Sequence, residues 1–407
     1  MSRPEPSPLA AHWTLDPRVT FLNHGAFGAC PREVLALQSE LRARMERDPI
    51  DFLTRAAEPL LDEARARLGA FLHADPDDLA FVDNATTGVN TVLRSLALRP
   101  GDELLTTDHA YNACANALRA VAETAGARVL VAAVPFPLRG PEEISAAVLG
   151  ALTPRTRLVL LDHVTSATGV LFPLETLVPA LQAKGVDVLV DGAHAPGMVP
   201  VDMGGLGAAY YTGNCHKWLC APKGAAFLHV RKDRKTGLRP LVISHGANSP
   251  RTDRSRFRLE FDWAGTRDPT PFLCVGKAID LVGGLVPGGW EEVRSRNGAL
   301  ARRARTLLAE ALGVAPPCPE SMLGSLAAVE LPAGREPPPA ALPDRDPLHL
   351  LLFERHRIEV PVYAWPGPAR RWIRVSPHLH NSEAQYRFLA DALREALDRT
   401  RAPATSA

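Results

Sequence analysis

The fold of this chain is decided by residues 210–230, YYTGNCHKWLCAPKGAAFLHV, where a lysine stands between two apolar runs. Residues 208–213 have the pattern of a buried strand that enters a turn, and residues 224–230 that of a strand that leaves one. Most lysines are solvated surface charges. Between two buried strands, however, the Lys217 ammonium would be desolvated, which lowers its pKa, and a neutral amine can attack an aldehyde to form a Schiff base. Lys217 is therefore a candidate catalytic lysine.

The sequence around this stretch predicts an α/β domain. Apolar runs of strand length alternate with helical patterns: LLTT at 104, RVLVAAV at 128, TRLVLL at 156, VDVLV at 186, AAYYT at 208 and AAFLHV at 225, with a further run at residues 79–82. Continuous apolar runs separated by helices are typical of a mainly parallel sheet that is buried on both faces.

Polar side chains follow four of these runs, and each group contains a histidine. The groups are DHAYN at 108, DHVTS at 162, DGAH at 191 and GNCHK at 213. A single histidine at a strand end is usually a structural residue. Because ligands of parallel α/β sheets bind at the carboxyl ends of the strands, the four groups together predict the rim of an active site.

Residues 83–88, DNATTG, form a small polar turn between the run at 79–82 and a helical pattern. The free backbone N–H groups and the positive end of a helix dipole attract an anion there, and threonine hydroxyls add donors. An ordinary helix cap by Asn84 or Thr86 explains the same residues. Both a phosphate site and a plain cap are compatible with this turn.

The composition restricts the partners. The 407 residues include 46 Lys and Arg against 45 Asp and Glu, so the net charge is +1. Neither nucleic acid nor an acidic membrane is an expected partner. No apolar stretch has the length of a signal peptide or a membrane span, which predicts a cytoplasmic protein. The six cysteines form no CxxC pair and no metal spacing with histidine, so we expect free thiols and no metal site.

We expect two domains. An irregular arm covers residues 1–20, a large domain covers 21–285, and a smaller α+β domain covers 286–407, with residues 21–75 packing partly on the smaller one. The basic segment RTDRSRFR at 251–258 is predicted to be a solvated loop. In the smaller domain, Arg374 on a predicted strand either faces solvent or holds a carboxylate by a two-pronged pair.

Taken jointly, these residues match one chemistry. A carboxylate such as Asp191 at a strand end can keep a pyridine nitrogen protonated, which makes the ring an electron sink. The motifs FLNHGAFG, FVDNATTGVN, TTDHAYNA, DGAHAPG, TGNCHKWLCAPKG, DWAGTRDPT and WIRVSPHLHN occur in that order. Over residues 20–395 the sequence thereby resembles the class V aminotransferase-fold enzymes, and in particular isopenicillin N epimerase-like proteins.

The resemblance implies a fold-type I enzyme that uses pyridoxal 5'-phosphate (PLP), with a mainly parallel seven-stranded sheet between helices. It implies a homodimer with active sites at the subunit interface. Lys217 would carry the cofactor and shuttle protons, Asp191 would pair with the ring nitrogen, and His194 would neighbour the ring oxygen. His109 occupies the position of the imidazole that stacks on the ring, although Tyr111 could take that place instead.

The resemblance also implies binding residues for the phosphate and the substrate. The phosphate would be held by the turn residues Ala85, Thr86 and Thr87, by Thr212 or Asn214, and by His216, with Gly265 and Thr266 reaching it from the partner subunit. Arg374 would take the α-carboxylate of an amino-acid substrate. Asn23, His24 and Tyr363 would face the substrate.

Three functions remain open at this point. The first is epimerisation at the α-carbon of an amino acid or aminoacyl side chain, which needs a second acid from Tyr111, His24 or Tyr363. The second is C–S lysis of a cysteine conjugate or sulfoxide; transamination is a further outcome of the same chemistry. Residues 360–374 contain no cysteine, which disfavours a persulfide-forming desulfurase. The third is a PLP-binding regulator, against which the absence of a DNA-binding domain before residue 20 argues.

Overall fold

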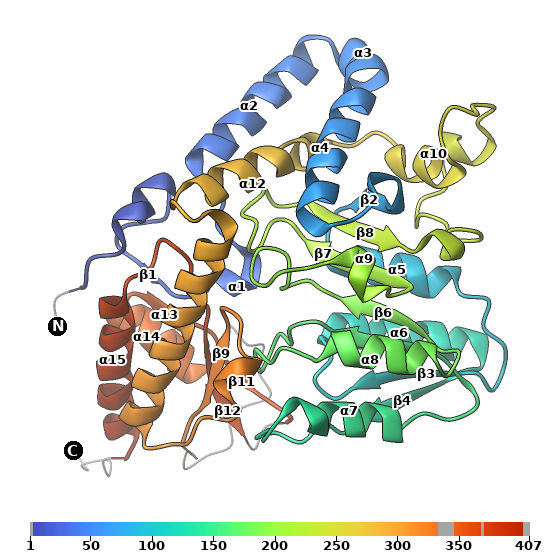
Figure 1. The fold of residues 1–407 in the computed structure, drawn as a ribbon. Coiled ribbons are helices and arrows are strands. Elements are labelled where there is room, and N and C mark those ends of the chain that lie inside the picture. Colours follow the sequence, from blue (N-terminus) through green and yellow to red (C-terminus); the bar gives the residue numbers. More distant parts are fainter. Residues whose placement is uncertain (1–2, 333–345, 368–369, 402–407) are drawn as a thin grey trace.

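The structure is a computed structural model that describes residues 3–332, 346–367 and 370–401 (Figure 1). A seven-stranded sheet with the order β2-β8-β7-β6-β5-β3-β4 lies at its centre. All neighbouring strands are parallel except for β8, which runs antiparallel to β2 and β7. The strands are β2 (Leu79–Val82), β3 (Glu103–Thr107), β4 (Arg128–Ala132), β5 (Thr156–Asp162), β6 (Asp187–Asp191), β7 (Tyr210–Asn214) and β8 (Ala226–Val230). The prediction of a mainly parallel sheet from seven apolar runs is confirmed.

Helices cover both faces of this sheet (Figure 1). On one face, Leu104 and Leu158 of the strands share a buried cluster with side chains of α5 (Ala85–Ser95) and α6 (Asn112–Ala125). On the other face, the adjacent strand residues Leu105 and Val159 pack with side chains of α7 (Pro141–Gly150) and α8 (Leu174–Gln182). Neighbouring residues of a strand point to opposite faces, so continuous apolar runs are what a doubly covered sheet requires.

The N-terminal segment joins the two parts of the molecule. Its helices α2 (Arg32–Arg47) and α4 (Ala57–Leu72) pack against α11 (Thr270–Leu273) and α12 (Val275–Gly284) of the large domain. Its strand β1 (Thr20–Phe21) pairs instead with β10 (Ile358–Glu359). Residues 3–19 pack on this segment, because Trp13 is buried and its indole N–H donates to the Ala29 carbonyl at 3.0 Å. They include the short helix η1 (Pro8–His12).

The C-terminal part begins after the break at residues 285–288 with the long helix α13 (Gly289–Leu312), which packs against α15 (Glu383–Arg401). A three-stranded antiparallel sheet has the order β11-β12-β9, from β11 (Val362–Ala364), β12 (Arg371–Val375) and β9 (Ala327–Glu330). Shorter elements complete the chain: α1 (His24–Phe27), α3 (Pro49–Asp51), the π-helical turn η2 (Phe52–Ala56), η3 (Pro76–Asp78), α9 (Met203–Leu206), η4 (Lys232–Arg234), η5 (His245–Asn248), α10 (Arg256–Asp262), η6 (Glu320–Met322) and α14 (Pro347–His356).

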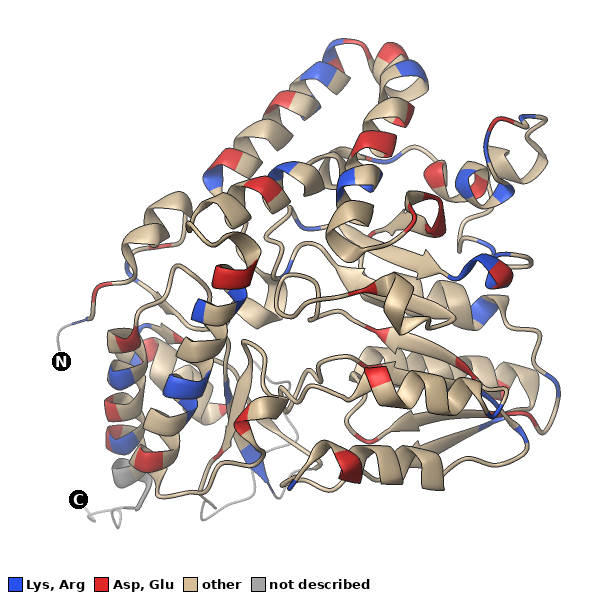
Figure 2. Ribbon diagram, viewed as in Figure 1, with Lys and Arg blue, Asp and Glu red and all other residues tan. Residues whose placement is uncertain are grey.

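The prediction of a solvated basic loop at residues 251–258 holds for residues 251–255, which lie outside the helices and are mostly exposed, and is wrong for the last three residues. Arg256 begins α10, and Arg258 is buried, with ion pairs to Asp62, Asp77 and Asp262. The local sequence could not reveal this, because the carboxylates come from distant segments. Figure 2 shows basic and acidic residues interspersed over the helices, while the strands of the central sheet are mostly uncharged.

All six cysteines are buried and free of disulfides. Within the residues that the structure describes, no single helix has both the length and the apolar composition to cross a membrane; one bent pair, Thr270–Gly284 with Gly289–Leu312, meets that test only when joined.

Candidate active site

Lys217 lies in the turn after β7 and lines a cavity of about 350 Å³ at the carboxyl ends of the strands. Its Nζ lies 3.1 Å from Nε2 of the buried His194. The indole N–H of Trp218 donates to Nδ1 of the same ring at 3.4 Å. A neutral imidazole that accepts at Nδ1 carries its proton at Nε2, so His194 can donate to an uncharged lysine amine. Burial and the positive charge of Arg374 lower the pKa of Lys217 to about 8, which favours the same state.

Asp191 ends β6 on the wall of this cavity. Its carboxylate accepts hydrogen bonds from the Ala193 N–H at 3.0 Å and from the Cys114 thiol at 3.1 Å. Asp162 of β5 stands directly opposite it in the parallel register and lines the same cavity. Burial, and then the charge of Asp191, raise the pKa of Asp162 well above its usual value. Burial and the neighbouring carboxylate thus favour the protonated form of Asp162.

Asp162 and Ser166 both line the cavity, and both belong to the group DHVTS that the sequence predicted at the rim of an active site. Neither residue was assigned a role of its own from the sequence. The proximity of Asp162 to Asp191 depends on the strand register, which an apolar run does not reveal.

The N-terminus of α5 faces the cavity through Asn84, Ala85 and Thr86. Asn84 caps the helix by accepting from the Thr87 N–H at 2.8 Å, and Asn214 accepts from the Ala85 N–H at 2.9 Å. The helix cap expected from the sequence is thus present, and it directs a positive helix end at the cavity.

Thr212 and Asn214 were the two alternatives for binding the phosphate, and of these Asn214 lines the cavity. The Thr212 hydroxyl is buried and donates to the Phe227 carbonyl at 2.8 Å. A Cβ at Gly88 would lie 2.2 Å from that hydroxyl oxygen, so glycine allows α5 to approach β7 closely. Thr212 thus positions the helix rather than the ligand.

His216 adds a further polar group to the cavity wall. Its Nδ1 lies 3.1 Å from the Ala225 carbonyl, to which it donates. Burial lowers the pKa of His216 to about 4, and a bound anion would favour its protonated form. A helix N-terminus, a threonine and a histidine together fit a phosphate group.

Arg374 of β12 is buried beside the cavity residue Ser166. Its guanidinium donates to the Ser166 carbonyl at 2.6 Å and to the Asn23 side-chain oxygen at 3.5 Å, and it lies over the Tyr363 ring. Its Nε has no partner within the described residues. No carboxylate within the described residues forms an ion pair with Arg374. A buried guanidinium in this state is suited to bind an incoming carboxylate.

His109 and Tyr111, the two candidates for the ring face, lie differently. His109 is buried away from the cavity, where its Nδ1 contacts the Thr168 hydroxyl at 2.9 Å and its ring meets Trp365 edge-on at 4.3 Å. Tyr111 lines the cavity at the start of α6. Burial, and to a smaller extent the nearby Asp191 carboxylate, raise the pKa of Tyr111. Tyr111 is therefore the one of the pair that a ligand would meet in this arrangement.

None of the predicted substrate residues lines the cavity itself, although Arg374 lies beside it. His24 lies behind the lysine turn, where its Nε2 donates to the Lys217 carbonyl at 3.1 Å. Tyr363 lies beneath Arg374 with its hydroxyl buried, and burial raises its pKa to about 12. Asn23 contacts Arg374 but does not itself line the cavity.

Gly265 and Thr266 lie outside the cavity of their own chain, on the loop between α10 and α11. Gly265 has φ +101, which favours glycine, and Thr266 is exposed. The next residue, Arg267, pairs at 3.5 Å with Asp83, which does line the cavity. Through Arg267, this loop contacts the edge of the cavity beside the start of α5.

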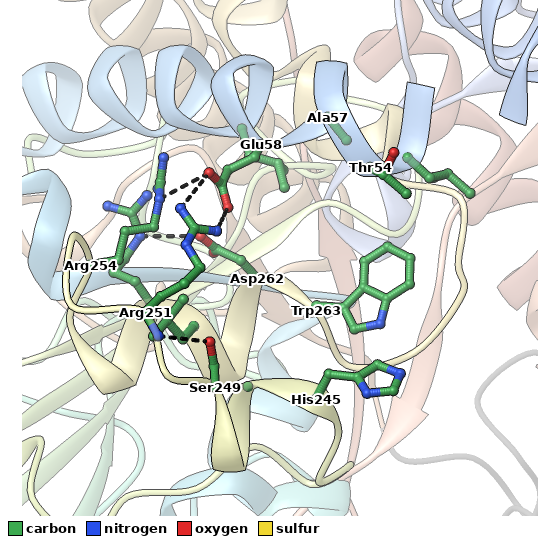
Figure 3. A pocket seen from close by; sticks show the side chains of 14 residues that line it. Thr54, Ala57, Glu58, His245, Ser249, Arg251, Arg254, Asp262 and Trp263 are labelled. Atoms are coloured by element: carbon green, nitrogen blue, oxygen red, sulfur yellow. Dashed lines mark hydrogen bonds and ion pairs between the residues drawn. The ribbon is translucent and has the colours of Figure 1, made fainter. Parts of the chain in front are cut away.

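A second cavity, of about 390 Å³, lies between α4 and α10 (Figure 3). Its arginines are already paired: Arg251 and Arg254 bind Glu58, and Arg258 binds Asp262. None of the candidate PLP or substrate residues lines it. The chemistry of the lysine site is therefore separate from this cavity.

Three comparisons relate the chain to known proteins. The family model for aminotransferase class-V matches residues 29–331. The chain is 39% identical to the isopenicillin N epimerase of Amycolatopsis lactamdurans over 94% of this chain and 96% of that protein. It is 36% identical to the isopenicillin N epimerase of Streptomyces clavuligerus over 93% and 95%. It is 32% identical to a probable chloroplastic L-cysteine desulfhydrase of Arabidopsis thaliana over 93% and 83%.

Among solved structures, a mutant of C-DES with glycine covalently linked to its PLP cofactor has a TM-score of 0.78 at 23% identity, covering 96% of this chain and all of that one. The complex of the cystine C–S lyase C-DES with cysteine persulfide has a TM-score of 0.76, also at 23% identity, over 93% and 98% of the two chains. These two structural similarities show that the chain has the same fold as C-DES.

Proposed function

The chain belongs to the aminotransferase class-V family of PLP-dependent enzymes, and from that premise we propose that it inverts the α-carbon of an amino acid or an aminoacyl side chain. The observation that supports inversion is the identity to two isopenicillin N epimerases, 39% and 36%, which exceeds the 32% to the desulfhydrase. The geometry of the site is compatible with this reaction, because a base and a separate acid both reach one cavity.

The residues at hand fit PLP. Asp191 would hold a proton on the ring nitrogen, and His194 would neighbour the ring oxygen. The start of α5 with Thr86 and His216 would hold the phosphate. When bound, PLP supplies an aldehyde for amino groups and a ring that withdraws electrons from the α-carbon. Their places around the cavity support these proposed roles.

Arg374 would bind the substrate α-carboxylate and so fix the direction of the α-hydrogen. Lys217, held as a neutral amine beside His194, would take the α-proton at its Nζ from one side of the substrate. Tyr111 would return a proton from its hydroxyl on the other side. Its raised pKa keeps that hydroxyl protonated, and it lines the cavity, unlike His24 and Tyr363.

Incubation with single amino acids in deuterated water tests this function. An epimerase incorporates deuterium at the α-carbon and yields both configurations, which chiral chromatography with mass spectrometry resolves. A lyase yields ammonia and pyruvate instead. Release of pyruvate without inversion would refute the proposal in favour of β-elimination.

A C–S lyase is the second candidate, and the chemistry of Cys114 favours it over a persulfide-forming desulfurase. The Cys114 thiol donates a hydrogen bond to the Asp191 carboxylate. Burial and the negative charge of Asp191 raise its pKa far above the usual thiol value, so it cannot supply a thiolate nucleophile. Simple expulsion of a β-sulfur group needs no such cysteine.

We also propose a homodimer with shared sites. Phe27 lines the active cavity yet is 74% exposed, and the apolar side chains of Leu241, Val242 and Ile243 are exposed as well. Exposed apolar groups of this kind are usual where another chain binds. The partner would then bring its Gly265 and Thr266 to the phosphate. Sedimentation of the holoenzyme as a monomer at micromolar concentration would contradict this arrangement.

A further inference from the structure

Three histidines gather behind the lysine turn, outside the active cavity. They are His24 of α1 and His378 and His380 of the segment after β12. All three side chains are at most 2% exposed, and the Trp13 ring meets both His378 and His380 edge-on. The cluster could not be foreseen from residue spacing, because His24 and His380 are 356 positions apart.

The hydrogen bonds of the cluster fix which nitrogens are free. His24 donates from Nε2 to the Lys217 carbonyl, so its Nδ1 carries no proton in the neutral ring. That Nδ1 lies 3.2 Å from Nε2 of His380. His378 forms a hydrogen bond with the Trp218 backbone, and its Nδ1 is buried without a partner among the described residues.

The spacing of these nitrogens suits a small metal ion. One ring nitrogen from each histidine lies within 4.8 Å of the other two. Two imidazole nitrogens bound to one tetrahedral zinc ion are about 3.3 Å apart, because each Zn–N bond is about 2.0–2.1 Å. The 3.2 Å between Nδ1 of His24 and Nε2 of His380, which a hydrogen bond spans without metal, is close to this separation. The rings of His24 and His378 stack with their centroids 4.3 Å apart, so one of them would turn about its side-chain bonds to direct its nitrogen at the same ion. A backbone carbonyl that accepts from the other ring nitrogen is the usual outer partner of a metal-binding histidine.

We propose that His24, His378 and His380 bind one divalent transition-metal ion of the zinc type. A cavity lined by Trp13, His380 and Asn381 reaches the cluster and provides a route for the ion and a solvent molecule as fourth ligand. Cys220 is not assigned as a ligand, because its Sγ lies near the Nε2 edges of His378 and His24, at 3.6 and 3.8 Å.

A bound metal ion would be linked to the active site through hydrogen bonds from its histidine ligands to the backbone of the lysine turn. His24 contacts the Lys217 carbonyl and His378 contacts the Trp218 backbone, so the ion would hold the turn that carries the cofactor lysine. Lys223 places a positive charge near His24, which weakens the affinity for any cation. The site would therefore bind metal reversibly, and binding would stabilise the folded chain.

Zinc binding by the holoenzyme tests the proposal. The protein is stripped with a chelator and equilibrated by dialysis with Zn²⁺ alone, and bound zinc is measured by atomic emission. We expect one ion per chain, and an affinity about 100-fold lower in His380→Asn. The matched control His245→Asn removes an exposed histidine of the second cavity, outside the cluster, and should bind as the parent does. The visible absorption of bound PLP and circular dichroism verify that each variant is folded.

X-ray absorption at the zinc edge gives a second readout that needs no variant. Three imidazole nitrogens and no sulfur around the zinc are the expected result. Failure to bind zinc, equal binding by His380→Asn, or a sulfur ligand would each overturn the proposal.

Discussion

Replacement of Arg374 by lysine tests the carboxylate site of this enzyme. Arg374 is 4% exposed and donates to the Ser166 carbonyl, while its remaining donors have no carboxylate partner within the described residues. Lysine keeps the positive charge but cannot form the two parallel hydrogen bonds of a guanidinium. The change therefore removes one charge-assisted hydrogen bond to the substrate and leaves the net charge of the site unaltered.

A hydrogen bond to a charged group contributes about 1.5–3 kcal/mol. At about 1.4 kcal/mol for each factor of ten, kcat/KM for α-hydrogen exchange should fall roughly 10- to 150-fold. The assay is deuterium uptake at subsaturating amino acid. The corresponding amino-acid amide lacks the carboxylate, so its exchange should change much less. Arg370→Lys is the matched control, because Arg370 precedes the same strand but pairs with Glu330 away from the cavity.

An equal loss of exchange for the acid and the amide would refute this reasoning, since it would mean that Arg374 supports the fold rather than the carboxylate. An unchanged rate for the acid would refute it as well.

Three further experimental outcomes are expected from the geometry. Uptake of PLP by the apoenzyme needs the neutral amine of Lys217, whose pKa is about 8. The rate of uptake, followed by visible absorption, should therefore fall about tenfold per pH unit below pH 8 and level off above it. Tyr111→Phe should keep α-deuterium exchange but slow inversion by roughly 100-fold in chiral analysis, because only the second acid is removed; equal loss of both would contradict its role. Gly88→Ala should lower the free energy of unfolding in urea by about 1–3 kcal/mol through overpacking against Thr212, whereas Gly150→Ala, with open space around its Cβ, should not.

The large domain could be predicted because the strands of its sheet, apart from the edge strand β4, are buried on both faces. The runs that become β3 to β8 are largely apolar, and a series of such runs separated by helices is specific to a doubly covered sheet. The Lys217 turn and the Asp191 strand end were found for the same reason, because polar residues interrupt a buried pattern there. The buried state of Arg258 was not foreseen, because Asp62 and Asp262, which pair with it, come from separate helices.

The site residues that sequence could not place depend on close approaches between distant segments. His24 lies behind Lys217 because Gly28 lets the first turn approach the lysine turn. A Cβ at Gly28 would lie 2.0 Å from the His216 carbonyl oxygen, and its φ of +71 also favours glycine. His109 and Tyr111 are two residues apart, so the sequence could not decide which of them faces the cavity. Contacts with distant residues such as Trp365 hold His109 away from it.

Every role assigned around the cavity depends on Lys217 as the residue that carries PLP. Reduction of the holoenzyme with borohydride, followed by proteolysis and mass spectrometry, locates the bound cofactor directly. We expect a single phosphopyridoxyl group on each chain, attached to Lys217. A phosphopyridoxyl group on Lys223 or any other lysine, with Lys217 unmodified, would contradict this central assignment.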